Sequence, residues 1–189
     1  VSDNTVGDNL TIDGDLDIAN NGGLSLTAGS FVTLEGDITI QNGGALDTQG
    51  SDMFFEGDAQ TYTDLSNSGS EQEMGSVQLN SATSFTLASN IKAESIINLT
   101  TLNAANNDIS IIGASGIVWE DLGTFNPGGV TQTVGLVGIA PEVSFGTFQN
   151  LIVTGSTNAN LKEAIIVNGD LGIAVGGSLT TSENLEIGG

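Results

Sequence analysis

Apolar and polar residues alternate in short runs along the first quarter of the chain. The apolar positions recur with a period of two, at Leu16/Ile18, Leu24/Leu26, Val32/Leu34 and Ile38/Ile40. A period of two turns alternate side chains to one face, so each run predicts a short β-strand with one buried side. The tetrads Asn20-Asn21-Gly22-Gly23 and Gln41-Asn42-Gly43-Gly44 predict turns between the strands, because Asn and Gly tolerate left-handed backbone angles.

These strands belong to a repeating unit, Gly-Asp-apolar-x-apolar followed by Gly-Gly-x-Leu. The first two Gly-Asp pairs are 22 residues apart and the first two Gly-Gly pairs are 21 apart. A period of this length fits one coil of a solenoid, and stacked coils would place Leu16 beside Ile38 and Leu24 beside Leu46. The sequence therefore predicts an all-β, right-handed parallel β-solenoid (β-helix) with coils of about 21–22 residues. The unit occupies residues 14–24, 36–46 and 169–179.

Three features qualify this prediction. An antiparallel sandwich stays open as an alternative, because hairpins use the same turn residues. Residues 59–76, rich in Ser, Gly and Glu, and residues 119–148, which contain both prolines, depart from the unit, so we expect irregular excursions there. We expect Lys92-Ala93-Glu94-Ser95 to form a polar corner within a coil. Residues 1–189 are expected to form a single solenoid domain.

Charge narrows the classes of partner. The chain has 23 acidic residues and 2 basic ones, with no His, giving a net charge of −21. Such a surface repels phosphate backbones and anionic lipid, so we expect no nucleic-acid partner. No apolar run approaches the roughly 18 residues of a membrane helix, so we expect no membrane insertion. An acidic surface suits the ionic strength outside cells, and we expect an extracellular or cell-surface location.

The residue inventory also limits catalysis. The chain contains no Cys, His or Arg, so disulfides and Ser-His or Cys-His nucleophile systems cannot form. A carboxylate pair for glycoside hydrolysis remains formally possible. Acidic residues beside strands are more simply interpreted as a solvated surface, and we expect the protein not to be an enzyme.

One acidic run predicts a metal site. Asp13, Asp15 and Asp17 alternate as in the opening of many Ca²⁺ loops, and calcium prefers hard oxygen ligands. On a straight strand the three carboxylates would spread over about 13 Å, so a bend at Gly14 would be needed for them to share an ion. Ca²⁺ is the one cofactor that the sequence suggests. A solvated acidic face is the alternative.

Aromatic residues predict a second site. Trp119 and Phe125, with Phe145 and Phe148, could form an exposed platform on which sugar rings stack. Clustered aromatic residues can instead fill a gap in the core or cover the end of a solenoid. Both interpretations stay open from the sequence.

Two sets of residues resemble repeats of known surface proteins. The Gly-Asp-Leu-x-Ile-x-x-Gly-Gly-x-Leu units are similar to the coils of filamentous-haemagglutinin-type adhesins. The phrase Gly123-Thr124-Phe125-Asn126-Pro127-Gly128-Gly129, followed by Gly146-Thr147-Phe148 and Asn168-Gly169-Asp170-Leu171, resembles repeats of large surface and secreted Bacteroidota proteins exported by the type IX system. This resemblance covers about 110 residues, from Ser76 onward. The sorting domain of such proteins is not visible in the sequence.

The resemblance implies a stalk or spacer, and the repeat pattern favours the same class. We expect a structural, adhesin-type segment or a filament subunit whose partners are further solenoid coils or other copies of the chain. A module that binds a glycan or surface polymer, stabilised by calcium, is the alternative. Because the sequence starts at Val1 with no signal-peptide pattern, we expect a processed or excised segment of a larger surface protein.

Overall fold

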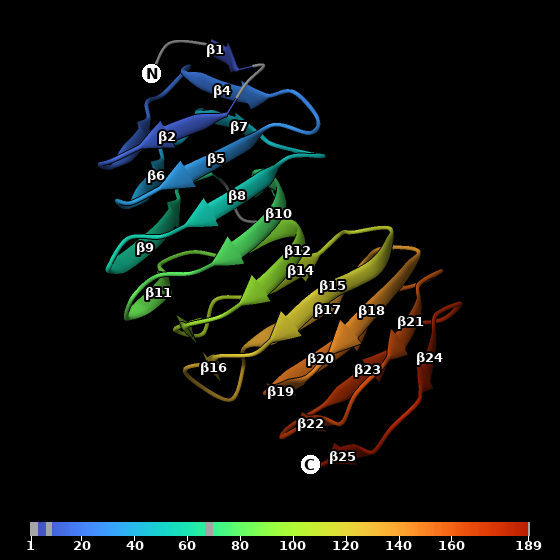
Figure 1. Cartoon of the computed structure of the whole chain (residues 1–189). Coiled ribbons are helices and arrows are strands. Elements are labelled where there is room, and N and C mark those ends of the chain that lie inside the picture. Colours follow the sequence, from blue (N-terminus) through green and yellow to red (C-terminus); the bar gives the residue numbers. More distant parts are fainter. Residues whose placement is uncertain (1–3, 7–8, 67–69, 189) are drawn as a thin grey trace.

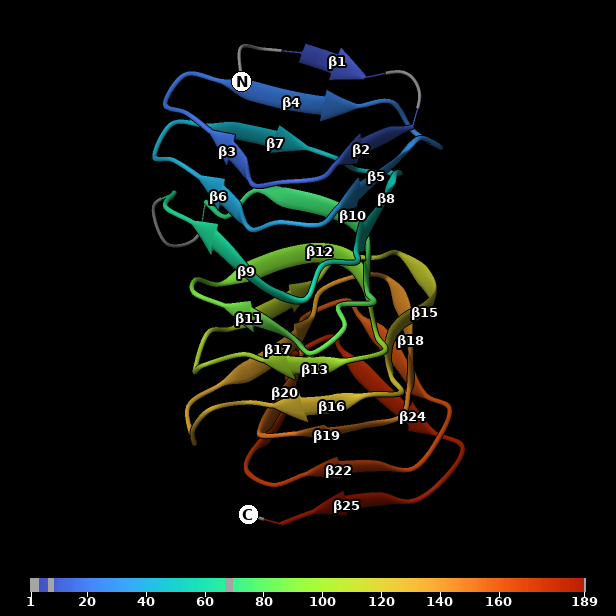
Figure 2. The ribbon, with the colours of Figure 1, turned by 60° about the vertical axis from the view of Figure 1, so that its left-hand side comes forward.

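The chain folds into a stack of coils whose strands are all parallel. The computed structural model describes residues 4–6, 9–66 and 70–188, with side chains from residue 9 onward. The described residues form 25 strands and no helix. Every strand pairing is parallel, and the coils descend from the N-terminal end to the C-terminal end in a right-handed sense (Figures 1 and 2). The parallel β-solenoid is confirmed.

The solenoid has three faces. The first contains β1 (Asn4–Val6), β4 (Gly23–Leu26), β7 (Ala45–Asp47), the first halves of β10 (Glu73–Leu79) and β12 (Ile91–Asn98), β14 (Ile109–Ile111), β17 (Thr133–Leu136), β20 (Asn150–Val153) and β23 (Leu171–Ile173). The second contains β2 (Leu10–Ile12), β5 (Phe31–Leu34), β8 (Asp52–Phe55), the second halves of β10 and β12, β15 (Ser115–Asp121), β18 (Ala140–Ser144), β21 (Asn158–Leu161) and β24 (Ser178–Thr181).

The third face contains β3 (Leu16–Ile18), β6 (Ile38–Ile40), β9 (Ala59–Asp64), β11 (Ser84–Leu87), β13 (Thr101–Asn103), β16 (Thr124–Asn126), β19 (Gly146–Phe148), β22 (Ile165–Val167) and β25 (Leu185–Ile187). β16 and β19 contact each other but belong to different sheets. None of the described residues forms a helix long and apolar enough to cross a membrane.

Apolar ladders run along the inside of all three faces. Leu16 pairs with Ile38 and Leu24 pairs with Leu46, as the repeat predicts. Alternation of buried and exposed residues continues in most strands, because each strand turns every second side chain inward. The inward side chains form one continuous hydrophobic core along the stack.

Coil length varies more than the repeat predicts. Paired positions on the second face, from Leu10 through Val32, Met53, Val77, Ile96, Trp119, Val143 and Leu161 to Thr181, are separated by 18 to 24 residues. The two 24-residue steps, Met53 to Val77 and Trp119 to Val143, contain most of the two segments expected to be irregular.

Those segments are more regular than expected. Residues 59–64 form β9, and β16, β17 and β18 lie within residues 119–148 and pair with neighbouring coils. The extra length is confined to the loops 65–72, of which 67–69 lie outside the described residues, and 127–132. Backbone hydrogen bonding explains this, because a coil that left the stack would lose its ladder on both sides.

The expectation of a polar corner at Lys92–Ser95 is wrong. These residues lie inside β12, which continues from the first face onto the second without a turn. Ala93 is fully buried and pairs with Met74 and Ile111, so the residue between Lys92 and Glu94 points into the core. Lys92 and Glu94 are polar because they lie on the outer face of this strand, on either side of the inward-pointing Ala93.

Some corners bring the backbones of neighbouring coils very close together. A Cβ added to Gly138 would lie 1.7 Å from the carbonyl oxygen of Gly113, and one added to Gly123 would lie 1.9 Å from that of Thr100. Neither glycine has a positive φ angle. Glycine at these corners is therefore required by close approach of the coils.

Candidate functional site

The outer surface of the second face is hollowed where the sheet forks. β12 pairs with β14 through Ile91–Ala93 and with β15 through Ile96–Asn98, so Glu94 and Ser95 lie between the two pairings. β15 then shifts register against β18 between Ile117 and Trp119, as in a β-bulge. β12 pairs with two different strands, and the bulge bends one of them, β15. Together these features leave a concave surface where the pairings of β12 diverge, which we call the fork.

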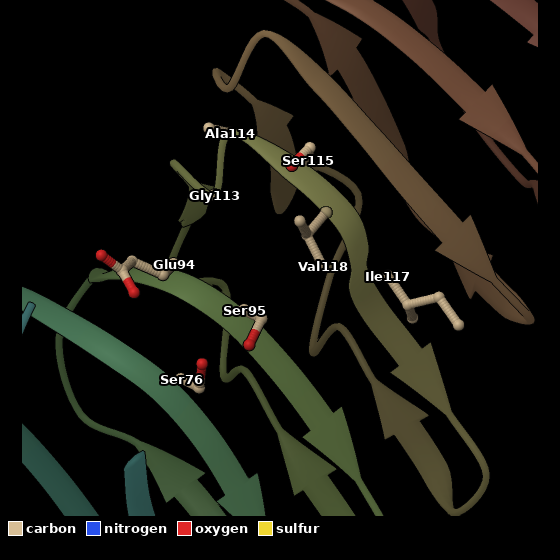
Figure 3. Close-up of a pocket in the computed structure, with 8 residues that line it drawn as sticks. All are labelled: Ser76, Glu94, Ser95, Gly113, Ala114, Ser115, Ile117 and Val118. Atoms are coloured by element: carbon tan, nitrogen blue, oxygen red, sulfur yellow. The ribbon is translucent and has the colours of Figure 1, made fainter. Parts of the chain in front are cut away.

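Two adjoining cavities occupy this concave surface. Their volumes are about 350 Å³ and 310 Å³, and both are lined by Ser76, Ser95 and Ile117. We call the two together the fork groove. Figure 3 shows its first part, where Ser76 and Ser95 lie on neighbouring strands, with Glu94 at one edge and Ile117 and Val118 on β15.

Strand register organises the groove into two outward columns. Asp52, Ser76 and Ser95 pair across β8, β10 and β12 and form the first column. The second column, two residues further along the same strands, consists of Phe54, Gln78 and Ile97. Because side chains two residues apart point to the same face, the columns run side by side across three coils.

The first column contains hydroxyl groups that have no partner. Ser95 is only 9 % exposed, yet neither its hydroxyl nor that of Ser76 makes a hydrogen bond with the described residues. The second column is apolar at both ends. These ends are Phe54, which packs edge-on against Phe31 with ring centroids 5.8 Å apart, and Ile97. Ile117 on β15, which also lines the groove, is 49 % exposed.

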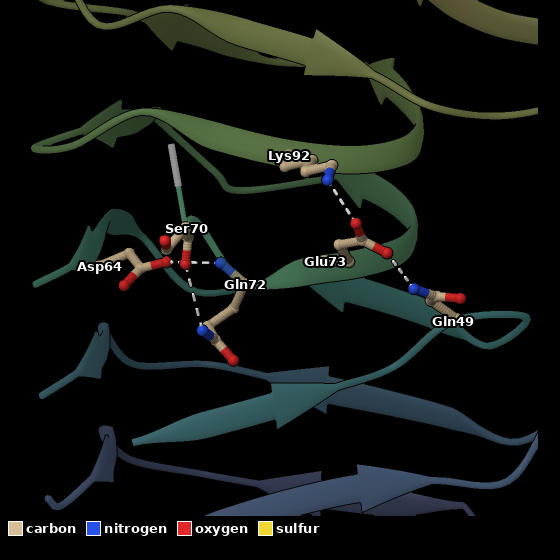
Figure 4. Close-up of polar contacts among 6 residues, drawn as sticks. All are labelled: Gln49, Asp64, Ser70, Gln72, Glu73 and Lys92. Carbon is tan, nitrogen blue, oxygen red and sulfur yellow. Dashed lines mark hydrogen bonds and ion pairs between the residues drawn. The ribbon is translucent and has the colours of Figure 1, made fainter. Parts of the chain in front are cut away.

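Negative charge borders the groove. Asp52 and Glu94 lie at its rim, and the Glu94 carboxylate accepts a hydrogen bond from the backbone N–H of Gly50 at 3.2 Å. Neither of the two lysines lines it. Lys92 bonds to Glu73, which also accepts from Gln49 (Figure 4), and Lys162 lies 3.0 Å from Glu142.

A second polar cluster ties β9 to the start of β10. The carboxylate of Asp64 accepts hydrogen bonds from the backbone N–H groups of Ser66 and Gln72, both at 2.8 Å. Figure 4 shows Gln72 beside Asp64, with its side-chain amide donating to the carbonyl oxygen of Ser70 at 3.4 Å. Asp64 is 6 % exposed, and its carboxylate also accepts from the hydroxyl of Tyr62 at 3.4 Å, so the cluster is structural.

The three aspartates proposed as calcium ligands do not converge. Asp15 Oδ1 accepts the backbone N–H of Asp37 at 2.9 Å, and Asp17 Oδ1 accepts from Gln41 Nε2 at 3.2 Å. Asp13 is exposed. Within residues 9–66 and 70–188, no group of three or more acidic side chains is gathered closely enough to hold a metal ion. Calcium binding by Asp13, Asp15 and Asp17 stays a prediction.

The aspartate of the Gly-Asp pair has a structural role that the sequence did not predict. Its side-chain oxygen accepts a backbone N–H from the next coil, which links adjacent coils outside the strand ladder. The same contact recurs at both Asp and Asn: Asp15 to Asp37 (2.9 Å), Asp37 to Thr61 (2.7 Å), Asn90 to Asp108 (2.9 Å), Asp108 to Thr133 (2.8 Å) and Asn150 to Asp170 (2.9 Å).

The aromatic residues proposed as a glycan platform are buried. Trp119 has no exposed surface and Phe125 is 8 % exposed. Their ring centroids are 5.3 Å apart, and Phe148 completes the cluster at 5.3 Å from Trp119. A ring without an accessible face cannot stack on a sugar, so the prediction of Trp119 and Phe125 as glycan-binding residues is wrong. Phe145 is 43 % exposed but belongs to no ring contact among the described residues.

A polar pair, the buried Asn98 and the half-buried Asp121, lies at the corner between the second and third faces. Asn98 is fully buried and donates from Nδ2 to Asp121 Oδ1 at 2.7 Å and to the carbonyl oxygen of Thr124 at 3.2 Å. Burial raises the pKa of the Asp121 carboxyl above its ordinary value. Hydrogen bonds from Asn98 and from the backbone N–H of Gly123 act in the opposite direction but are the smaller effects.

We expect Asp121→Asn to raise the free energy of unfolding only at pH values above the ordinary aspartate pKa of about 3.9. Where the native pKa is raised, the native state binds more protons than the unfolded state, so ionisation of Asp121 lowers stability as pH rises through that window. The asparagine keeps an oxygen acceptor for Asn98 and carries no charge. The free energy of unfolding, measured by urea titration at several pH values, should therefore favour the variant increasingly as pH rises, then level off.

Asp17→Asn is the matched control, because Asp17 is exposed and the substitution changes net charge equally. The same urea titrations on this variant measure the effect of removing one exposed charge. A stability difference for Asp121→Asn that stays constant from acid to neutral pH would contradict the assignment.

No family model, curated protein or solved structure matches the chain. The resemblance to adhesin coils and to type IX secretion substrates therefore stays a prediction.

The residues of the fork groove were not predicted from the sequence. A signal for them exists in Ser76-Val77-Gln78-Leu79 and Ser95-Ile96-Ile97-Asn98, two segments with the same alternation whose outward residues become neighbours.

Proposed function

We propose that the chain is a non-catalytic, rod-like segment of an extracellular or cell-surface protein, serving as a stalk or as a filament subunit. The observation that carries this proposal is the single hydrophobic core that continues along the stack from Leu16 to Val167. A continuous core makes the stack a mechanically uniform element in which each coil is supported by its neighbours.

Dimensions and surface support the same role. With a rise of about 4.8 Å per coil, some eight turns span roughly 40 Å. The net charge of −21 keeps such a rod solvated at the ionic strength of extracellular fluids. The carboxylates that sit near strand starts, such as Asp15 and Asp37, are engaged in contacts between coils.

Two measurements test the proposal. An antibody raised against the chain should label intact cells that express the parent gene, and labelling only after permeabilisation would contradict a surface location. Analytical ultracentrifugation over a range of concentrations separates the two variants. A monomer at every concentration identifies a stalk segment, and growth to larger species with concentration identifies a filament subunit.

A further inference from the structure

We propose that the fork groove binds an uncharged oligosaccharide. This goes beyond the structural role and does not depend on it, because a binding groove can be present on a stalk, on a filament or on neither. The proposal rests on the unpartnered hydroxyls, on the apolar column beside them and on the charge at the rim.

Ser95 is the observation that points to a ligand. It is nine-tenths buried, it lines both cavities, and its hydroxyl has no partner among the described residues. Ser95 Oγ is not one of the enclosed polar atoms, so this hydroxyl opens into the groove, where it can bond a ligand. Ser76 presents a second unpartnered hydroxyl on the adjacent strand, and Figure 3 shows the two serines on neighbouring strands that line the groove. Each hydroxyl can donate and accept, as sugar hydroxyls do.

The neighbouring column suits the other side of a sugar ring. Phe54 and Ile97 line the groove beside the serines, and Ile117 faces them from β15. Apolar side chains of this kind pack against the C–H face of a hexose while polar groups bond its hydroxyls. Coils rise by about 4.8 Å, close to the length of one hexose unit, so successive sugars can meet successive coils.

The charge and the strand pairing exclude other ligands. Asp52 and Glu94 repel anions, and neither lysine lines the groove, so an acidic saccharide is disfavoured. An added peptide strand needs a free sheet edge, but β10 is paired with both β8 and β12, and the Glu94 carbonyl accepts from the N–H of Gly113. A neutral sugar chain needs no such edge.

The test uses the whole chain and a panel of neutral hexamers of β-1,4-linked glucose, β-1,4-linked mannose and N-acetylglucosamine, with oligogalacturonate as the anionic comparison. We expect at least one neutral hexamer to bind and the oligogalacturonate not to bind. Chemical-shift changes on adding that hexamer should be centred on Ser76, Ser95, Gln78 and Ile117. This mapping needs no variant and therefore does not depend on whether a variant folds.

The variants provide the second arm. Ser95→Leu removes the hydroxyl and fills the groove, and it should weaken binding at least tenfold. Ser110→Leu is the matched control, since Ser110 is an outward serine in β14 on the first face and lines neither cavity. It should leave binding unchanged. Failure of every neutral hexamer to bind, shift changes elsewhere on the solenoid, or equal weakening by both variants would overturn the proposal. So would preferential binding of a cationic peptide.

Discussion

Replacing Trp119 by alanine is expected to lower the free energy of unfolding by about 4 kcal/mol, the upper part of the range for large-to-small core substitutions. Trp119 is the largest of the fully buried side chains and contacts Phe125 and Phe148 at ring-centroid distances of 5.3 Å. Its removal empties the centre of a coil, where the hydrogen-bonded ladders above and below limit collapse of the cavity.

Substitutions of Trp119 test packing alone, without a change in hydrogen bonding. Its indole nitrogen is buried and makes no hydrogen bond with the described residues, so the alanine variant loses only packing. Trp119→Phe should therefore be much milder, because it keeps most of the apolar volume and removes an unpaired N–H group. Urea titration with circular dichroism as the signal measures both.

Phe31→Ala is the matched control on the outer surface. Phe31 is 37 % exposed and packs only against Phe54 among the described aromatic rings. We expect a loss of no more than about 2 kcal/mol, because the ring lies on the outer surface and its removal leaves no enclosed cavity. If Phe31→Ala were as costly as Trp119→Ala, the aromatic cluster would not be the centre of core stability.

The ladders could be predicted from the sequence because they depend only on local alternation. Leu16 and Ile38 share a face whether or not the remaining coils are regular. The same holds for the tight corners, where Asn and Gly mark turns in any stack. Residue patterns with a short range therefore determine strands and turns well.

The phase of the repeat could not be predicted in this way. The first unit places Leu16 on the third face and Leu24 on the first, whereas the last places Leu171 on the first and Leu179 on the second. The unit thus encodes strand, turn and strand without encoding which face it occupies. Coil lengths between 18 and 24 residues shift one unit against another by a whole face.

The fork groove depends on that phase. β12 pairs with both β14 and β15 because the coils around it differ in length. The residue pattern within Ile91–Asn98 does not predict this double pairing. The burial of Trp119 is a similar case, since its side chain packs against Phe125 of β16 and Phe148 of β19. A site formed by residues from several coils can be predicted only when the register of those coils is known, and here the register comes from the structure.

Gln60 shows how a single polar side chain fixes such a register. It is 2 % exposed, and its amide Nε2 donates to the carbonyl oxygens of Leu34 at 3.0 Å and Gly36 at 2.8 Å. Its Oε1 accepts from the backbone N–H of Gly57 at 3.0 Å and from the hydroxyl of Ser81 at 2.7 Å. The four contacts join three successive coils at one corner.

Gln60→Leu is expected to lower the free energy of unfolding by about 3 kcal/mol. Leucine is of similar size, so the loss comes mainly from the hydroxyl of Ser81, which stays buried without its partner, and from the partly buried N–H of Gly57 and carbonyl of Gly36. The Leu34 carbonyl also accepts from the N–H of Glu56 and is affected less. Urea titration measures the loss. The rate of hydrogen exchange should increase most at the amide of Gly57.

The control is Gln41→Leu, because Gln41 is half-buried and its side chain makes one hydrogen bond, to Asp17 at 3.2 Å. We expect it to cost less than about 1 kcal/mol, the usual net value of one exposed hydrogen bond. Equal losses in the two variants, or faster exchange spread evenly over all coils in Gln60→Leu, would mean that Gln60 does not hold this corner. A loss confined to the coils around Gly57 would instead show that the register of the solenoid is fixed coil by coil, by buried amides such as this one as much as by the apolar ladders.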